Sequence, residues 1–353
     1  MPKIRVLIVD DSVVVRRIVK NILSEDNAIE VVGVAANGKI ALAKIPQINP
    51  DIIILDVEMP EINGLEVLKR IRETYIKLPV IMFSAITELG ATVTLDALSL
   101  GANDYVTKPS NMKSKEVAKS YIKQQLIPKI KVFCKDINTT QKINFSSSIY
   151  PQKTVIKPIK NKAQKFNILA IGVSTGGPDA LAKIIPQIPA NFPVPIVIVQ
   201  HMPPIFTKRL AQRLNSASQI EVKEAKDGDI LQKQKAFIAP GDYHITLEKK
   251  GTIIKIMTNQ NPPENSCRPA VDVLFRSVAK IYQENTLGLI LTGMGQDGLH
   301  GCQSIRELGG QVLVQDEESS VVWGMPGIVA NAGLANQILS LDNIIQEVIK
   351  MVM

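Results

Sequence analysis

Short apolar runs alternate with amphipathic stretches in the first third of the chain. Between residue 3 and about residue 125, five runs rich in Val and Ile predict strands over 4–9, 31–35, 52–55, 80–83 and 105–106. The stretches between these runs carry apolar residues at helical spacing. This alternation predicts an α/β domain with a parallel, doubly wound sheet.

The same alternation returns at residue 166. Four more apolar runs predict strands over 168–171, 196–199, 287–291 and 312–314, and residues 235–256 have the pattern of a hairpin. Residues 134–165 have no sustained helix or strand period. We therefore predict an N-terminal domain over 1–125, a flexible linker over 126–165 and a C-terminal α/β domain with a parallel sheet over 166–353.

The charge is concentrated in the predicted linker. The chain has 353 residues and a net charge of +8, and residues 134–165 hold seven lysines against one aspartate. The two domains are then nearly neutral, and only 4% of the residues are aromatic, which is too few to suggest base-stacking surfaces. No nucleic-acid partner is expected.

Membrane and secretory signals are not apparent. No run approaches the roughly 18 apolar residues of a membrane span, and the N-terminal segment has only four apolar residues in a row before Asp10. The cysteines, Cys134, Cys267 and Cys302, form no Cys-x-x-Cys pair. We expect a cytoplasmic protein that is not embedded in a membrane.

Polar residues follow four of the five N-terminal strands, namely Asp10, Asp11, Asp56, Ser84 and Lys108. The carboxyl ends of parallel strands meet at one sheet edge, so these residues are expected in one pocket. Three carboxylates need a cation, and their oxygen atoms suit Mg²⁺. The set predicts phosphoryl transfer to Asp56, with Lys108 and Ser84 contacting phosphoryl oxygens.

Ser174 lies in a glycine-rich turn between a strand and a helix of the C-terminal domain. Such a turn exposes the hydroxyl beside backbone N–H groups that can stabilise an oxyanion. A phosphate-binding loop is the alternative, but Ser174 takes the place of the second glycine of the dinucleotide motif, and no acidic residue lies between Asp179 and Glu221. No Gly-Lys-Ser/Thr sequence follows either. We predict a serine nucleophile.

A serine nucleophile needs a base and an acid that orients the base. His201 follows the strand over 196–199, so it is expected at the same sheet edge as Ser174. His244, in the hairpin-like segment, either lines the site or caps a turn, and His300 is expected on a helix surface.

The orienting acid is predicted to be Asp297, which follows the strand over 287–291. It could instead cap the helix expected over 299–308, or serve in both roles. The order Ser, His, Asp differs from the Ser, Asp, His order of α/β-hydrolases, so the same chemistry would have arisen separately.

The N-terminal domain resembles a response-regulator receiver domain. The resemblance rests on VLIVDDS at 6–12, IIILDVEMPEINGLEVL at 52–68, MFSA at 82–85 and DYVTKP at 104–109. It implies a flavodoxin-like fold, phosphorylation of Asp56 by a histidine kinase, and Mg²⁺ held by Asp10, Asp11 and Asp56. It further implies that Ser84 and Tyr105 change position as a switch with Lys108, and that the peptide bond between Lys108 and Pro109 is cis.

The C-terminal domain resembles the catalytic domain of the chemotaxis protein-glutamate methylesterase/protein-glutamine glutaminase (CheB-type) family. The matching stretches are IGVSTGGPDAL at 171–181, VQHMPPIFTKRLAQRLN at 199–215, APGDYH at 239–244, RPAVDVLFRS at 268–277, LTGMGQDG at 291–298 and DEESSVVWGMPG at 316–327. The resemblance implies a triad with an oxyanion neighbourhood, formed by Ser174, His201, Asp297, Thr175 and Met294. Ile205, where glycine is common, and His300, where a small residue is common, depart from the pattern outside the triad.

Together the resemblances imply a phosphorylation-activated chemotaxis hydrolase. Its substrates would be glutamate γ-methyl esters, and also glutamines, on the cytoplasmic domains of methyl-accepting chemoreceptors. The esterase chemistry would need no cofactor. The receiver would inhibit by covering the Ser174 face until Asp56 is phosphorylated. Whether the basic linker binds an anionic membrane surface is left open.

Two other classes of protein remain as alternatives. A non-enzymatic response regulator would use Gly176 and Gly177 to bind an anionic ligand. A transcriptional regulator is disfavoured, because residues 166–353 have no helix-turn-helix pattern and no basic recognition helix.

Overall fold

The computed structural model describes residues 2–109, 115–134 and 164–353 and divides the chain into two compact units, Met1–Ser147 and Ser148–Met353. Residues 135–163 of the predicted linker lie outside the described residues. Among the described helices, none is long and apolar enough to cross a membrane.

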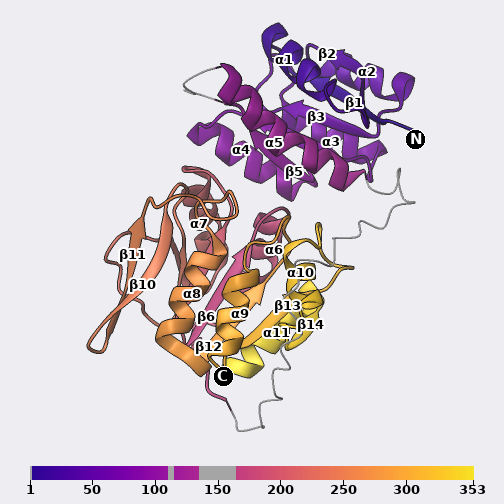
Figure 1. Cartoon of the computed structure of the whole chain (residues 1–353). Helices are drawn as coiled ribbons and strands as arrows, with labels where there is room; N and C mark the ends of the chain where they lie inside the picture. The colour runs from indigo at the N-terminus through magenta and orange to yellow at the C-terminus, as the bar shows by residue number, and fades with distance from the viewer. Residues whose placement is uncertain (1, 110–114, 135–163) are drawn as a thin grey trace. The chain divides into compact units, whose positions relative to one another are not determined.

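The N-terminal unit, drawn in indigo to magenta in Figure 1, is built on a parallel sheet. The sheet has five strands in the order β2-β1-β3-β4-β5. This order is that of flavodoxin-like folds, so the predicted doubly wound sheet is confirmed. The strands are Ile4–Val9 (β1), Ile29–Ala35 (β2), Ile52–Asp56 (β3), Val80–Ser84 (β4) and Asp104–Thr107 (β5). The helices are Val13–Leu23 (α1), Gly38–Ile48 (α2), Gly64–Thr74 (α3), Glu88–Ser99 (α4) and Lys115–Phe133 (α5).

Helices cover both faces of this sheet. The inward side chains of α1 and α5 join one core cluster with alternate residues of the strands, while α2, α3 and α4 pack against one another as neighbours. The first four helices begin where a polar side chain accepts a hydrogen bond from the first turn, at Ser12, Asn37, Asn63 and Thr87. The loops that follow the strands, and not the strands themselves, therefore fix where each helix starts. Helix α5 continues to Phe133, so residues 126–133 of the segment interpreted as a linker are helical.

The C-terminal unit is built on a seven-stranded parallel sheet with the order β14-β13-β12-β6-β7-β9-β8. The strands are Ile168–Val173 (β6), Ile196–Gln200 (β7), Glu221–Glu224 (β8), Lys235–Ile238 (β9), Thr286–Ile290 (β12), Gln311–Gln315 (β13) and Gln337–Leu339 (β14). The α-helices are Gly177–Ile184 (α6), Phe206–Ala217 (α7), Val271–Tyr282 (α8), Leu299–Glu307 (α9), Met325–Asn331 (α10) and Leu341–Val352 (α11). Two short 3₁₀ helices cover Ile185–Gln187 (η2) and Gln283–Asn285 (η3).

The hairpin lies later in the chain than predicted. Its strands are His244–Lys250 (β10) and Ile253–Asn259 (β11), whereas β9 belongs to the parallel sheet. The apolar residues of β9 pair with β7 in the sheet, which the sequence pattern alone does not distinguish from hairpin pairing. The polar edge strand β8 was missed because its residues lack an apolar run.

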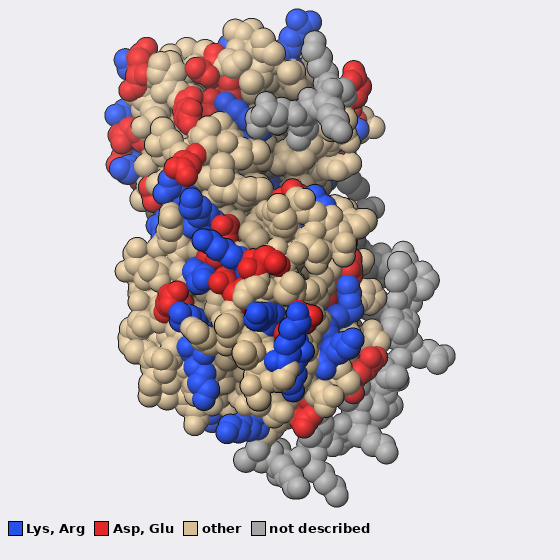
Figure 2. Space-filling model, turned by 90° about the vertical axis from the view of Figure 1, so that its left-hand side faces the viewer, with Lys and Arg blue, Asp and Glu red and all other residues tan. Residues whose placement is uncertain are grey.

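One core unites the sheet with the hairpin and the helices on the same side. Buried side chains of β6, β7 and β12 pack against α8 and α9, and the hairpin contributes Ile245, Leu247 and Ile256. This packing fixes the start of α8 at the sheet, near the carboxyl ends of its central strands. On the face drawn in Figure 2, Lys and Arg side chains are interspersed with Asp and Glu.

Candidate active site and phosphorylation site

The predicted acidic pocket forms at the carboxyl ends of β1, β3 and β5. Asp10 and Asp56 are each 1% exposed, and Lys108 places its Nζ 2.9 Å from Asp10 Oδ2 and 2.8 Å from Asp56 Oδ2. The other oxygen of each carboxylate accepts a backbone N–H of the loop that follows it. The structure therefore brings one lysine between two buried carboxylates.

Burial is the largest influence on the pKa of Asp56. Desolvation raises the pKa of Asp56 to about 6, the neighbouring Asp10 carboxylate adds to the rise, and Lys108 opposes it. The pKa of Lys108 is also raised, because hydrogen bonds to Asp56 and Asp10 outweigh the desolvation that lowers it. A cation beside Asp56 would lower the pKa of this carboxyl and favour its ionised form.

The residues present fit Mg²⁺. Carboxylate oxygens of Asp10, Asp11 and Asp56 lie within 4.8 Å of one another, and Asp11 is exposed to incoming ligands. Hard oxygen donors at this spacing match the preference of Mg²⁺, which keeps several waters. Asp11 also lines a shallow cavity with Val57, Glu58 and Met59.

The proposed switch residues are both buried. Ser84 is fully buried, and its hydroxyl lies 3.2 Å from the carbonyl oxygens of Ala85 and Gly90, not against Asp56. Tyr105 is 8% exposed and points inward, and desolvation raises the pKa of its phenol well above the ordinary value.

The expected cis bond between Lys108 and Pro109 is not found, because the one cis peptide among the described residues joins Arg268 to Pro269. Trans is the favoured state of most X-Pro bonds, and Lys108 reaches both carboxylates in that geometry.

Ser174 and His201 follow adjacent strands of the C-terminal unit. Val173 of β6 pairs with Gln200 of β7, so the next residue on each strand is Ser174 and His201 respectively. The His201 N–H bonds the Val173 carbonyl, and Gln200 Nε2 donates to the Ser174 carbonyl at 2.9 Å. The two side chains thus emerge at one edge of the sheet, as predicted, although no hydrogen bond joins them in the described part of the chain.

His201 and Asp297 are in direct contact. His201 Nε2 lies 2.7 Å from Asp297 Oδ2, with the histidine side chain 12% exposed and the aspartate 2%. Burial raises the pKa of the Asp297 carboxyl, but hydrogen bonds from His201 and from backbone amides outweigh burial and hold its pKa below the ordinary value. Because Nε2 is occupied by a carboxylate, Nδ1 is the nitrogen of His201 left to act as a base.

Asp297 caps a helix, but not the one predicted. Its carboxylate accepts the N–H groups of Val271 at 2.6 Å and Asp272 at 3.0 Å, the first two residues of α8. The residue before α9 is instead Gly298, with φ 97° and no side-chain cap. A negative charge at the start of α8 satisfies two otherwise unpaired donors and is favoured by the helix dipole.

Cys267 is a site residue that the sequence analysis missed. Its Sγ lies 3.6 Å from His201 Nδ1, the nitrogen that Asp297 leaves open. Burial lowers the pKa of His201, but the neighbouring Cys267 and Asp297 outweigh burial and raise it to about 10. Cys267 is therefore the side chain next to the imidazole nitrogen that would act as the base.

The predicted oxyanion neighbours lie beside Ser174. The Thr175 carbonyl accepts the Thr292 hydroxyl at 3.0 Å, and the Ser174 N–H donates to the Thr292 carbonyl at 3.0 Å. A Cβ at Gly293 would come within 2.9 Å of Ser174 Cβ, so Met294 follows a glycine packed on the serine.

The other two histidines lie outside the proposed triad. His244 is 1% exposed and uses both ring nitrogens, Nδ1 to accept from the Ala270 N–H and Nε2 to contact the Pro262 carbonyl. It thereby ties down the loop that carries Cys267. His300 is exposed on α9, as expected.

Ile205 occupies a strained position. It precedes α7 with φ 74°, in the left-handed region where a β-branched residue is an outlier and glycine is at ease. Glycine would adopt this conformation without the steric cost that Ile205 carries. Ile205 lies at the end of the loop that begins with His201.

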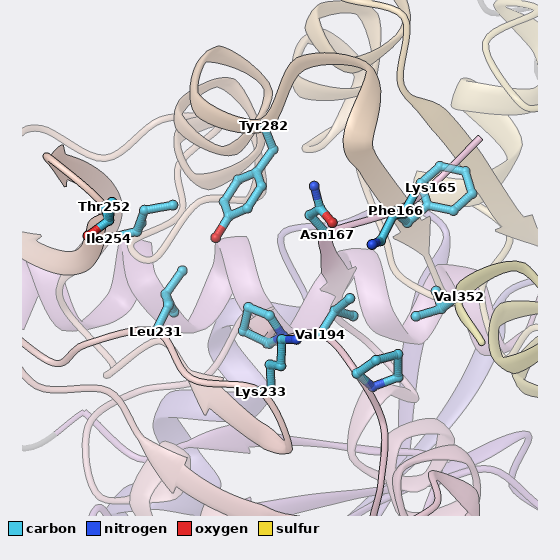
Figure 3. Close-up of a pocket in the computed structure, with 12 residues that line it drawn as sticks. Lys165, Phe166, Asn167, Val194, Leu231, Lys233, Thr252, Ile254, Tyr282 and Val352 are labelled. Carbon is cyan, nitrogen blue, oxygen red and sulfur yellow. The ribbon is translucent and has the colours of Figure 1, made fainter.

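A cavity of about 420 Å³ lies at the opposite end of the sheet (Figure 3). It is lined by Asn167 and Pro195, which precede β6 and β7, together with Lys233 and Tyr282. The predicted site residues are at the carboxyl ends of these strands, so this cavity is not where the proposed chemistry occurs.

The fold and the two sites define a two-unit α/β protein with a buried aspartate–lysine pocket in one unit and, in the other, Ser174 on the strand next to a His201–Asp297 pair. The model of the CheB methylesterase family matches residues 169–348, and that of the response regulator receiver domain matches residues 6–118. The chain therefore belongs to the CheB methylesterase family, in the form that carries a receiver domain.

Relatives and a solved structure agree. A "Protein-glutamate methylesterase/protein-glutamine glutaminase" of Trichodesmium erythraeum is 65% identical over 352 residues, covering 99% of each chain. One from Pyrococcus abyssi is 39% identical, covering 99% of this chain and 94% of the relative. The Thermotoga maritima CheB methylesterase catalytic domain superposes with a TM-score of 0.52 at 44% identity, covering 53% of this chain and all of that domain.

Proposed function

We propose that this protein is a phosphorylation-activated chemotaxis methylesterase that hydrolyses glutamate γ-methyl esters of methyl-accepting chemoreceptors. The observation that carries the proposal is the 2.7 Å contact between His201 and Asp297, one strand away from Ser174. The names of the relatives support the substrate class. We place its action in the cytoplasm, on the receptors' cytoplasmic domains.

Each group of the proposed triad has one task. His201 Nδ1 takes the Ser174 proton as Oγ attacks the ester carbonyl, and Asp297 holds the imidazole by Nε2 and stabilises its charged form. Backbone N–H groups near Thr175 and Met294 receive the charge on the carbonyl oxygen. Methanol leaves with the proton from His201, and a water activated by the same imidazole then releases the glutamyl product.

The same residues can deamidate glutamine. An amide differs from an ester in that its leaving group must be protonated before the C–N bond breaks. His201 becomes an imidazolium when it takes the Ser174 proton, and it can then supply this proton to the leaving group. The second name carried by the relatives, protein-glutamine glutaminase, supports this activity.

The N-terminal pocket is proposed to control the rate. Asp56 accepts a phosphoryl group from a chemotaxis histidine kinase, while Lys108 pairs with a phosphoryl oxygen. Mg²⁺ held by Asp10, Asp11 and Asp56 would neutralise the charge on the transferred group. Ser84 and Tyr105 are proposed to rearrange around the new phosphate, and the esterase rate rises as a result.

The test is mass spectrometry of a methylated receptor cytoplasmic fragment incubated with the full chain, with and without Mg²⁺ and acetyl phosphate. The parent should remove methyl groups from the fragment stepwise, and the phosphodonor should raise its rate. In Asp56→Asn the phosphodonor should not raise the rate. Ser174→Ala should reduce the rate by about 10⁴-fold or more. Unchanged methylation in every condition would leave a receiver joined to a binding module and overturn the proposal.

A further inference from the structure

Cys267, His201 and Asp297 form a second arrangement of nucleophile, base and acid around one imidazole. Cys267 Sγ is 3.6 Å from Nδ1, and Asp297 Oδ2 is 2.7 Å from Nε2. The carboxylate oxygens are already engaged by backbone N–H groups and by Asn265, so Asp297 is held in place. This is the geometry in which a histidine activates a cysteine thiol.

A tight turn holds the thiol against the imidazole. Glu264 and Cys267 exchange both backbone hydrogen bonds, and the central residues Asn265 and Ser266 both have positive φ. Such a two-residue turn is rigid and requires left-handed backbone at both positions.

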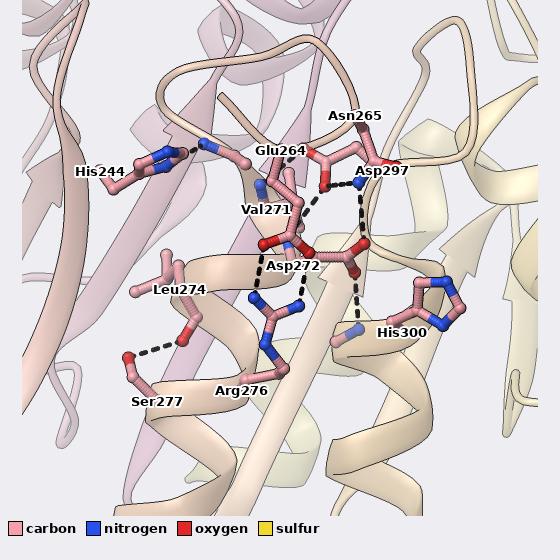
Figure 4. Close-up of polar contacts among 12 residues, drawn as sticks. His244, Glu264, Asn265, Val271, Asp272, Leu274, Arg276, Ser277, Asp297 and His300 are labelled. Atoms are coloured by element: carbon pink, nitrogen blue, oxygen red, sulfur yellow. Dashed lines mark hydrogen bonds and ion pairs between the residues drawn. The ribbon is translucent and has the colours of Figure 1, made fainter. Parts of the chain in front are cut away.

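Side chains fasten this turn at two points (Figure 4). Asn265 Nδ2 donates to Asp272 Oδ2 at 2.9 Å and to Asp297 Oδ1 at 3.0 Å. The Arg276 guanidinium of α8 donates two hydrogen bonds of 2.6 Å to the Glu264 carboxylate. The position of Cys267 is thus built into the site and does not depend on a loose loop.

Cys267 is also the accessible cysteine. It is partly exposed, whereas Cys134 and Cys302 are 3% and 0% exposed. Desolvation raises the pKa of the Cys134 thiol to about 12 and that of Cys302 well above its ordinary value. Buried thiols of this kind are inert, so they serve as internal controls.

We propose that Cys267 is a modification site, where hydrogen peroxide oxidises a thiol activated by His201 and the resulting sulfenic acid stops the esterase. The effect on hydrolysis rests on the proposed function, but the oxidation itself does not. His201 is a shared base: it can accept the proton of Ser174 or of Cys267, and not of both at once.

The oxidation balances without another reactant. The Cys267 proton passes to His201 Nδ1, and the thiolate sulfur attacks one peroxide oxygen. The S–O bond forms as the O–O bond breaks, so sulfur loses two electrons and peroxide gains them. The departing hydroxide takes the proton from the imidazolium and leaves as water, which regenerates neutral His201. The new hydroxyl on sulfur then lies against Nδ1 and competes with Ser174 for it.

The first arm of the test measures oxidation directly. The full-length protein is treated with hydrogen peroxide and dimedone, which captures sulfenic acids, and peptide mass spectrometry follows each cysteine. A free thiol is only a few per cent ionised at pH 7, so we expect Cys267 to be captured about 10-fold faster than Cys134 or Cys302. His201→Gln should remove most of this advantage. Equal rates at the three cysteines, or an unchanged Cys267 rate in His201→Gln, would overturn the proposal.

The second arm measures hydrolysis on the same samples. The rate, as a fraction of that before treatment, should fall in step with Cys267 capture and return with a thiol reductant. Cys267→Ser should keep its own initial rate under peroxide. Full capture of Cys267 with no loss of rate, or equal inactivation of Cys267→Ser, would refute inhibition. An untreated protein that hydrolyses no ester would instead refute the proposed function, and the first arm would still decide whether Cys267 is activated.

Discussion

Asp297→Asn tests whether one carboxylate both orients His201 and caps α8. The amide is nearly the same size, but it replaces one acceptor oxygen with an NH₂ group. Asp297 Oδ2 accepts the Val271 N–H and contacts His201, whereas Oδ1 accepts the N–H groups of Asp272 and Gly298. In either orientation at least one buried N–H meets another donor.

The expected cost follows from these contacts. A buried donor without an acceptor costs about 1–3 kcal/mol, and loss of the negative charge at the start of α8 adds about 0.3–1 kcal/mol. The sum is about 3 kcal/mol, which for a unit of this size lowers the unfolding temperature by about 6–12 °C. Hydrolysis should fall by about 10⁴-fold, because the imidazole loses the partner that sets its tautomer.

Calorimetry and ester hydrolysis on the full chain measure the two effects separately. The control is Asp342→Asn, an exposed aspartate in the first turn of α11, which should change stability by about 0.5 kcal/mol or less. Unfolding of Asp297→Asn at the parental temperature would refute the capping role. Parental hydrolysis in the same variant would refute the orienting role.

Three further results are expected. Ile205→Gly should raise the free energy of unfolding by about 0.5–1 kcal/mol in denaturant titration, because relief of about 1–2 kcal/mol of left-handed strain exceeds the entropic cost of glycine. Ile205→Ala keeps the strain, so an equal rise in that variant would contradict this explanation. A base must be neutral, so the raised pKa of His201 places the acid limb of the kcat/KM profile toward about pH 10. Because Cys267 contributes to that rise, Cys267→Ser should move the acid limb to lower pH. Identical pH profiles of the parent and Cys267→Ser would show that Cys267 does not raise the pKa of His201. Phosphorylation of Asp56 by acetyl phosphate needs the ionised carboxylate, so at low Mg²⁺ the phosphorylation rate should fall as the pH drops through about 6. At high Mg²⁺ this fall should occur at lower pH. A pH dependence that Mg²⁺ does not change would show that the ion does not bind this carboxylate.

The sequence predicted the parts of the molecule that depend on a regular period. The strands that carry Asp56, Ser174 and His201 are buried apolar runs, and parallel strands bring their carboxyl ends to one edge, so these residues could be placed before any coordinates. The polar edge strand β8 has no such run, and its place in the sheet depends on pairing with β9.

The remaining site residues depend on contacts between distant segments. Asp297 was expected near α9, which follows it directly, but it caps α8, which begins 26 residues earlier. A turn whose two central residues, Asn265 and Ser266, have positive φ brings Cys267 to His201. The hydrophobic periodicity of the sequence does not predict this turn. The conformation of Ile205 likewise became visible only in the backbone.

The central claim is that Ser174 is a nucleophile activated by His201. The most direct measurement is labelling of the full chain with a serine-directed phosphonate, with the adduct mapped by peptide mass spectrometry in the parent, His201→Gln and Asp342→Asn. The account predicts a single adduct on Ser174 in the parent and in Asp342→Asn, and labelling reduced by orders of magnitude in His201→Gln. An adduct on another residue, or equal labelling without the histidine, would contradict it.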